Sequence, residues 1–192
     1  ELRIQQHFID SADLQYQVSD VLAKPLDAAV QALLASVTGG GKVLVAGLGA
    51  SMALAQYLSS LLVGGFERER PGLAALTLGA DAVWATAWPG EDALARQVQA
   101  LGHAGDVLVL VSAHGEEVPL VLAVQAAHER EMTVLAITGG TGGAAAKALR
   151  ETDVHVCVPH ERAARVREVQ QLALHCLCDG IDAQLLGEQE PM

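Results

Sequence analysis

Two turns of this sequence carry residue types that bind small anionic molecules. The first, Gly47-Leu48-Gly49-Ala50-Ser51, leads from an apolar run into a helical pattern that starts near Ser51. Gly47 and Gly49 permit a tight turn, and the free N–H groups at the start of the helix favour an anion. A dinucleotide-binding turn would need a third glycine at a spacing that this sequence does not provide. The first turn therefore favours a small anion over a dinucleotide.

The second turn combines a hydroxyl, an imidazole and two carboxylates. It reads Ser112-Ala113-His114-Gly115-Glu116-Glu117 and also follows an apolar run. Glu116 and Glu117 stand at the expected start of a helix, where the dipole stabilises a carboxylate by about 0.3–1 kcal/mol. They either fill an anion slot themselves or face solvent and leave the slot open. His114 is either a surface or hydrogen-bonding residue, or a new acid/base.

Five short apolar runs of β character alternate with helical patterns through the middle of the chain. The runs are Val43–Ala46, Leu73–Leu78, Val107–Val111, Thr133–Ile137 and Val154–Val158. This alternation predicts parallel strands joined by helical crossovers. Ligands of open parallel sheets bind beyond the carboxyl ends of the strands, which is where both turns lie.

Helical patterns flank the expected sheet at both ends of the chain. Residues 1–40 predict N-terminal helices, the second of which begins at Pro25, because a missing N–H costs little in a first turn. Apolar residues at spacings of three and four predict a long helix from about Arg162 to Leu186, packed in the core or between subunits. With no linker or repeat, we expect one domain over 1–192: helices in 1–40, the sheet in 41–160 and the long helix in 161–187.

Composition and charge narrow the class of protein. The 192 residues are 51% apolar but only 3% aromatic, which favours helices built from Ala, Leu and Val packed closely on a sheet. A net charge of −11 argues against direct binding to nucleic acid. We expect neither a membrane span nor a secretion signal, and therefore a cytoplasmic protein. The three cysteines predict reduced structural thiols.

The nearest approach to a charge run is Glu67-Arg68-Glu69-Arg70. Its signs alternate, which is typical of a solvated loop edge. The alternative is a rim of ion pairs between subunits.

The order of these turns and elements resembles the SIS (sugar isomerase) domain family, in particular the phosphoheptose isomerases and the related DnaA initiator-associating proteins (DiaA). The most specific stretches are Phe66–Pro71, Ala100–Leu108 and Cys176–Asp182, and the resemblance runs from about Gly41 to Leu186. It implies a three-layer, flavodoxin-like α/β fold: a five-stranded parallel sheet with helices on both faces. It also implies a homotetramer with sites at subunit interfaces.

The resemblance assigns proton transfer to a Glu and a His, whose positions are occupied here by Leu61 and His175. A leucine has no proton to exchange, so His175 is the only retained catalytic candidate. Some family members bind zinc through four positions, which are Tyr57, Leu61, Arg167 and His175 in this chain. Only one of these is a usual zinc ligand, so we expect no metal and no other cofactor.

The ligand turns also depart from the family pattern. A family member cradles a phosphate with several hydroxyls of the second turn, of which this chain keeps Ser112. Arg167, which replaces a family Gln, is a candidate to pair with a glutamate of that turn across a subunit boundary. The loop between Ala87 and Gln97 is about four residues shorter than the family's. The expected ligand-binding residues are Gly47, Gly49, Ser51, Ser112, His114, Gly115, Glu116 and Glu117.

These departures favour a non-catalytic SIS protein that acts as a DiaA-like regulatory adaptor. Its expected partners are other proteins such as the replication initiator, with a phosphosugar as a possible residual ligand. Leu185 and Leu186 are the candidate partner-binding pair, unless they pack within the tetramer. The alternative is a sedoheptulose 7-phosphate isomerase, or a sugar-phosphate sensor, rebuilt around His114, His175 and Ser51.

Overall fold

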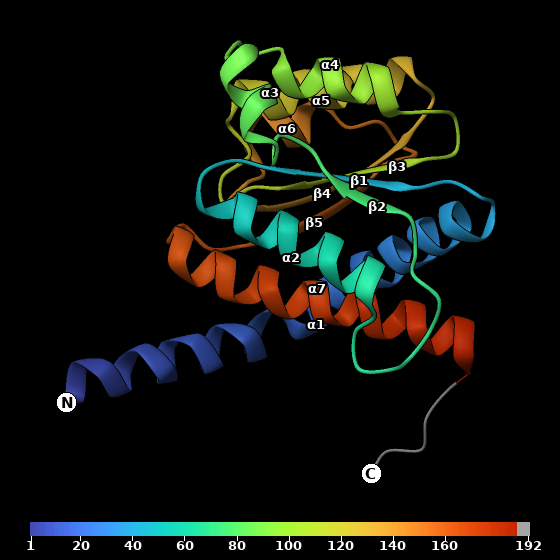
Figure 1. Cartoon of the computed structure of the whole chain (residues 1–192). Coiled ribbons are helices and arrows are strands. Elements are labelled where there is room, and N and C mark those ends of the chain that lie inside the picture. Colours follow the sequence, from blue (N-terminus) through green and yellow to red (C-terminus); the bar gives the residue numbers. More distant parts are fainter. Residues whose placement is uncertain (188–192) are drawn as a thin grey trace.

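The computed structural model describes residues 1–187 as a parallel sheet between two layers of helices (Figure 1). The strand order is β2-β1-β3-β4-β5, and every neighbouring pair is parallel. The strands are β1 (Val43–Gly47), β2 (Ala75–Thr77), β3 (Val107–Val111), β4 (Thr133–Gly139) and β5 (Val154–Val158). The helices are α1 (Leu2–Thr38), α2 (Ala50–Gly64), α3 (Ala82–Ala87), α4 (Ala93–Leu101), α5 (Val118–Glu129), α6 (Gly143–Ala148) and α7 (Ala163–Leu186). This arrangement confirms the predicted α/β fold.

The two faces of the sheet bury separate apolar cores. Successive side chains of a strand point to opposite faces, so Val43 and Val45 of β1 join the core under α1, α2 and α7. Leu44 and Ala46 join the core under α4 and α5. Every residue of β1 and β3 is buried, which explains why these strands read as continuous apolar runs.

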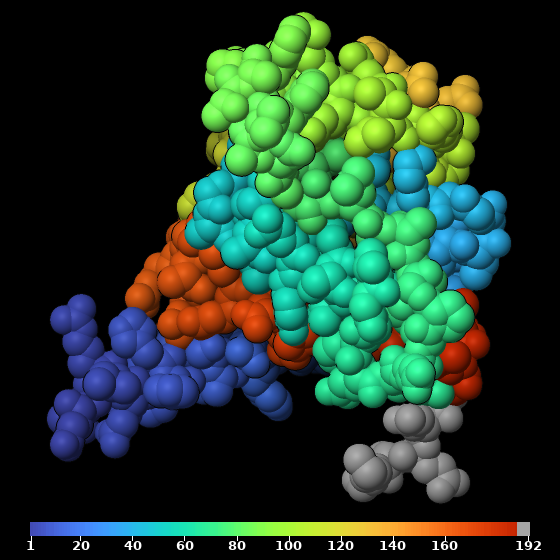
Figure 2. Space-filling model, in the orientation of Figure 1, coloured from blue at the N-terminus to red at the C-terminus, as the bar shows by residue number. Residues whose placement is uncertain are grey.

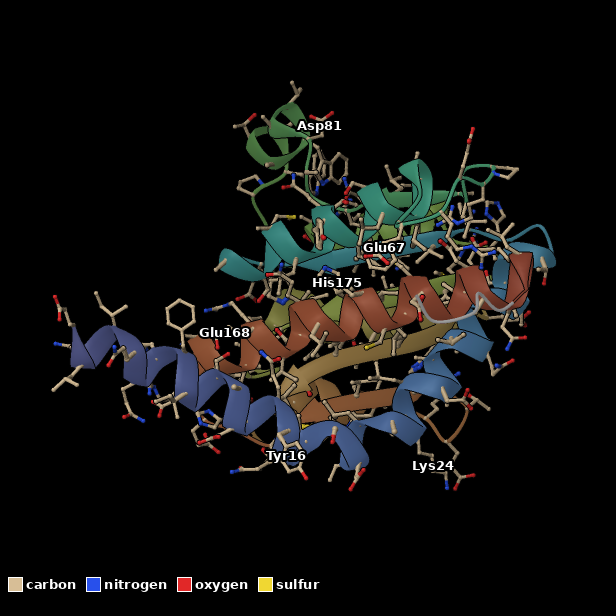
Figure 3. All side chains as sticks on the ribbon, turned by 90° about the horizontal axis from the view of Figure 1, so that it is seen from below. Tyr16, Lys24, Glu67, Asp81, Glu168 and His175 are labelled. Carbon is tan, nitrogen blue, oxygen red and sulfur yellow. The ribbon has the colours of Figure 1, made fainter. Side chains whose placement is uncertain are left out.

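The N-terminal region forms one helix rather than the expected two. Pro25 lies inside α1 instead of at the start of a second helix. A proline within a helix removes one backbone hydrogen bond and bends the axis, and the α1 ribbon changes direction near its middle (Figure 3). By length and composition alone, α1 is long and apolar enough to cross a membrane. Its buried residues, however, pack on α7 and β5.

The loop between α2 and β2 holds two helix ends together. Arg70 donates to the carbonyl oxygens of Leu61 and Leu62 at the end of α2, and its Nε forms an ion pair with Asp182 of α7. The side chains of Arg70 and Asp182 are each 1% exposed. Arg68 donates to carbonyl oxygens at the end of α7, including that of Gly187.

The prediction of a fully solvated loop edge is therefore half wrong. Glu67 and Glu69 are exposed, but Arg68 and Arg70 turn inward because the last carbonyls of two helices lack donors of their own.

Candidate functional site

The two turns singled out in the sequence follow neighbouring strands. Gly47, the last residue of β1, pairs in register with Val111, the last residue of β3. The turns that begin at Leu48 and Ser112 therefore leave the same edge of the sheet side by side, beyond the carboxyl ends of the strands.

The first turn is tight and opens directly into α2. A Cβ on Gly47 would lie 2.6 Å from the carbonyl oxygen of Ser51, so a side chain there would collide with the start of the helix. The N–H of Ser51 donates to the carbonyl oxygen of Leu48, and Ser51 is buried. Gly49 has a φ of 55° and open space beside it. The backbone there is free to approach a ligand closely.

The second turn is closed by its own side chains. Ser112 Oγ accepts the N–H groups of His114 and Gly115 at 3.1 and 2.7 Å and donates to Glu117 Oε2 at 2.7 Å. Glu117 thus takes the hydroxyl proton that a phosphate oxygen would need as a donor. Glu116 and His114 are exposed beside it. One predicted carboxylate occupies the turn and the other faces outward.

Gly115 allows the second turn to touch the turn after β4. Its φ is 74°, and a Cβ there would lie 2.1 Å from the carbonyl oxygen of Gly142. A polar pocket of about 260 Å³ opens between these turns and is lined by His114, Glu116, Gly139, Gly140, Thr141 and Glu161. Two of the predicted ligand-binding residues therefore face a real hollow, although the hollow is acidic.

His175 lies deeper, between α7 and α2 (Figure 3). Its Nε2 is 2.9 Å from Tyr57 Oη, and the two rings meet edge to face with centroids 5.6 Å apart. Phe66 stacks on the imidazole at 5.3 Å between centroids. Leu61, one turn after Tyr57, packs against the apolar core. The retained histidine is thus held by a phenol and a benzene ring instead of facing a carboxylate.

Gln170 is a residue of this region that the sequence analysis missed. Its side chain is fully buried, and its Nε2 donates to the carbonyl oxygens of Ser112 and Ile137 at 2.7 and 3.1 Å. It joins α7 directly to the base of the second turn. A polar residue within an apolar helical stripe is the signal that would have found it, because a buried amide must bond to something.

The four positions that the family resemblance links to zinc do not suit a metal here. Leu61 has no donor atom, Arg167 brings a positive charge, and the Nε2 of His175 already contacts Tyr57.

Arg167 has a guanidinium with no ion-pair or hydrogen-bond partner within residues 1–187, and its Nε is buried. It pairs with neither Glu116 nor Glu117 inside one protomer. A pair across a subunit boundary stays a prediction.

Leu185 and Leu186 end α7 with their side chains 38% and 41% exposed. The backbone carbonyl of Leu186 accepts from Arg68. Their proposed partner role depended on the adaptor function, which the comparisons below contradict.

Comparison with known proteins identifies the family. The SIS domain matches residues 6–139. A phosphoheptose isomerase of Methylibium petroleiphilum is 54% identical, covering 99% of this chain and 97% of that protein, and one of Aromatoleum aromaticum is 44% identical, covering 98% and 97%. The solved phosphoheptose isomerase of Neisseria gonorrhoeae superposes with a TM-score of 0.88 at 38% identity, covering 94% of this chain and 98% of that one.

These relatives overturn the expectation of a non-catalytic adaptor. Full-length relatives at 44–54% identity are named for an isomerase, so the interpretation that leaned away from an enzyme is wrong. Nothing in these names supports the replication initiator as a partner. The departures from the family pattern at Leu61 and in the ligand turns do not outweigh this full-length match. By sequence and by fold, the chain belongs to the SIS domain family.

Proposed function

We propose that this protein is a phosphosugar isomerase that interconverts sedoheptulose 7-phosphate and the corresponding aldose phosphate. The observation that carries the proposal is the 54% identity, over 99% of the chain, to a protein named phosphoheptose isomerase. The first ligand turn, which opens into α2, supplies a place for an anion, and His175 supplies a group that exchanges protons.

The reaction moves hydrogen between two neighbouring carbons. A base takes a proton from C1 of the ketose while the C2 carbonyl oxygen gains one, which gives an enediol. A proton then returns to C2 as the C1 hydroxyl loses its own and becomes the aldehyde. His175 is assigned to this exchange, because a neutral imidazole takes a proton and its protonated form returns one. Leu61 takes no part.

Arg167 is assigned to the anionic end of the substrate. Its guanidinium is half-buried and unpaired within the described residues, in a chain whose net charge is −11. A cation in the second turn of α7, which begins just beyond the carboxyl end of β5, would offset the repulsion between a phosphate and the two glutamates of the second ligand turn. Replacement by Gln should raise KM for the phosphosugar more than it lowers kcat.

Turnover of sedoheptulose 7-phosphate tests the proposal directly. The wild-type protein should be active, and His175→Asn should lower kcat by about 100-fold or more, the usual range for loss of a general acid/base. His103→Asn is the matched control, since this exposed histidine lies at the opposite edge of the sheet beside Lys42. Folded wild-type protein without turnover would refute the proposal. Calorimetric binding without turnover would indicate a sugar-phosphate sensor.

We further propose that the enzyme is a cytoplasmic homotetramer. The first turns of α1 project from the body of the protomer (Figures 1 and 2) and expose Leu2, Ile4, Phe8 and Ile9. A largely apolar groove of about 330 Å³ lies between α1 and α7. Isolated apolar side chains are common on surfaces, but an apolar arm beside an apolar groove supports self-association.

Light scattering after size exclusion tests this assembly. The wild type should elute as a tetramer, and Phe8→Glu should shift the protein toward smaller species. A monomeric wild type at micromolar concentration would contradict it.

A further inference from the structure

A hydroxyl beside His175 can donate and accept a proton, which Leu61 cannot. Tyr57 Oη lies 2.9 Å from His175 Nε2, and this contact joins two neighbouring helices, α2 and α7. Tyr57 lies six residues beyond Ser51, so it is about 9 Å along the helix axis from the first turn. It stands between the anion end of the site and the position of Leu61.

We infer that Tyr57 is a positioning residue that decides which nitrogen of His175 carries the proton, and that it does this work in place of the missing carboxylate. The inference rests on the proposed isomerase function.

The donors and acceptors at this contact set the tautomer. A phenolic hydroxyl both donates and accepts, and a neutral imidazole has one nitrogen of each kind. When Nε2–H of neutral His175 donates to Tyr57 Oη, the lone pair that takes a proton from the substrate is on Nδ1. When His175 is protonated at Nδ1, Nε2–H still donates to the same hydroxyl. The contact therefore persists in both states of the imidazole, as repeated proton transfer requires.

The surroundings hold the imidazole in place for this exchange. Phe66 stacks on one face with an interplanar angle of 28°, and the Tyr57 ring meets it edge on at 71°. Both aromatic rings pack against the apolar core, so neither is free to swing away. A ring fixed on two sides loses little orientational freedom when substrate binds.

Tyr57→Phe removes only the hydroxyl and keeps the ring contact. Tyr16→Phe is the matched control, because Tyr16 is 85% exposed on α1. The readouts are the nitrogen-15 shifts of the His175 imidazole in the full-length protein, assigned with His175→Asn, and kcat and KM for sedoheptulose 7-phosphate. We expect the Nε2–H tautomer to dominate in the wild type and to give way to a mixture in Tyr57→Phe. The value of kcat should fall about 10-fold with KM within about 2-fold, the size expected for one lost neutral hydrogen bond.

The outcomes separate this inference from the proposed function. An unchanged His175 spectrum in Tyr57→Phe overturns the inference whatever the activity. A changed spectrum with wild-type kcat overturns the role in turnover. If the wild type itself is inactive, the proposed function fails, and a changed spectrum still supports control of the tautomer by Tyr57.

Discussion

Replacing Arg70 by Met should be among the most destabilising single changes in this protein. The side chain is 1% exposed and forms an ion pair with Asp182, which is equally buried, and it donates to two carbonyl oxygens at the end of α2. Methionine fills similar space but leaves Asp182 as an unpaired buried charge. Breaking a buried pair in this way costs about 3–5 kcal/mol.

For a chain of this length, that loss corresponds to a fall in Tm of about 6–20 °C. The measurement is thermal and urea unfolding at one fixed protomer concentration, because the proposed self-association would contribute to apparent stability. Asp182→Leu combined with Arg70→Met removes both charges and should recover much of the loss. If Arg70→Met costs less than about 1 kcal/mol, or the double variant is worse than the sum of the single ones, the pair does not act as argued.

Three further outcomes follow from buried groups and from one turn. Burial opposes ionisation of Asp106, but hydrogen bonds from Lys42 and from the backbone N–H of His103 outweigh burial and lower the pKa of this carboxyl. The ionised carboxylate therefore stabilises the fold above the ordinary pKa of 3.8, and this stabilisation is lost as the pH falls through the lowered pKa. Asp106→Asn should lower the free energy of unfolding in urea by about 1–3 kcal/mol at pH 7, and the difference from the wild type should shrink as the pH falls toward 2. Gly115→Ala should lower the free energy of unfolding in urea by about 2 kcal/mol or more. Gly40→Ala, at a similar positive φ but with open space around it, should lower it less, and equal losses would show that the clash with Gly142 does not matter. Burial raises the pKa of Cys178 to about 12, so this thiol should resist Ellman's reagent at pH 8 until the protein unfolds, and rapid native labelling would contradict this.

The strands and the ligand turns could be predicted from the sequence because their signals are local. An apolar run such as Val107–Val111 is typical of a strand buried on both faces of a sheet, and Gly49 and Gly115 mark the two ligand turns. The position of both turns at one edge then follows from parallel topology. The local signal at Pro25 pointed the wrong way, since packing of α1 on α7 and β5 outweighs the tendency of proline to end a helix.

Contacts between distant segments could not be predicted. Arg70 and Asp182 are 112 positions apart, and Tyr57 and His175 are 118 apart. Each residue alone reads as a surface charge or a core aromatic. The error about function has another source, because the changes at Leu61 and in the ligand turns were visible in the sequence, whereas the 54% identity to a protein named phosphoheptose isomerase came only from comparison.

Three side chains along α7 fix the position of this helix relative to the rest of the protomer. Gln170 fixes it to the ends of β3 and β4, His175 to α2, and Asp182 to the loop after α2. A slide by a single residue would move it about 1.5 Å and turn it by about 100°, which would break all three attachments together. The helix therefore has one permitted register. A partner subunit that displaced α7 would shift the second ligand turn and His175 together.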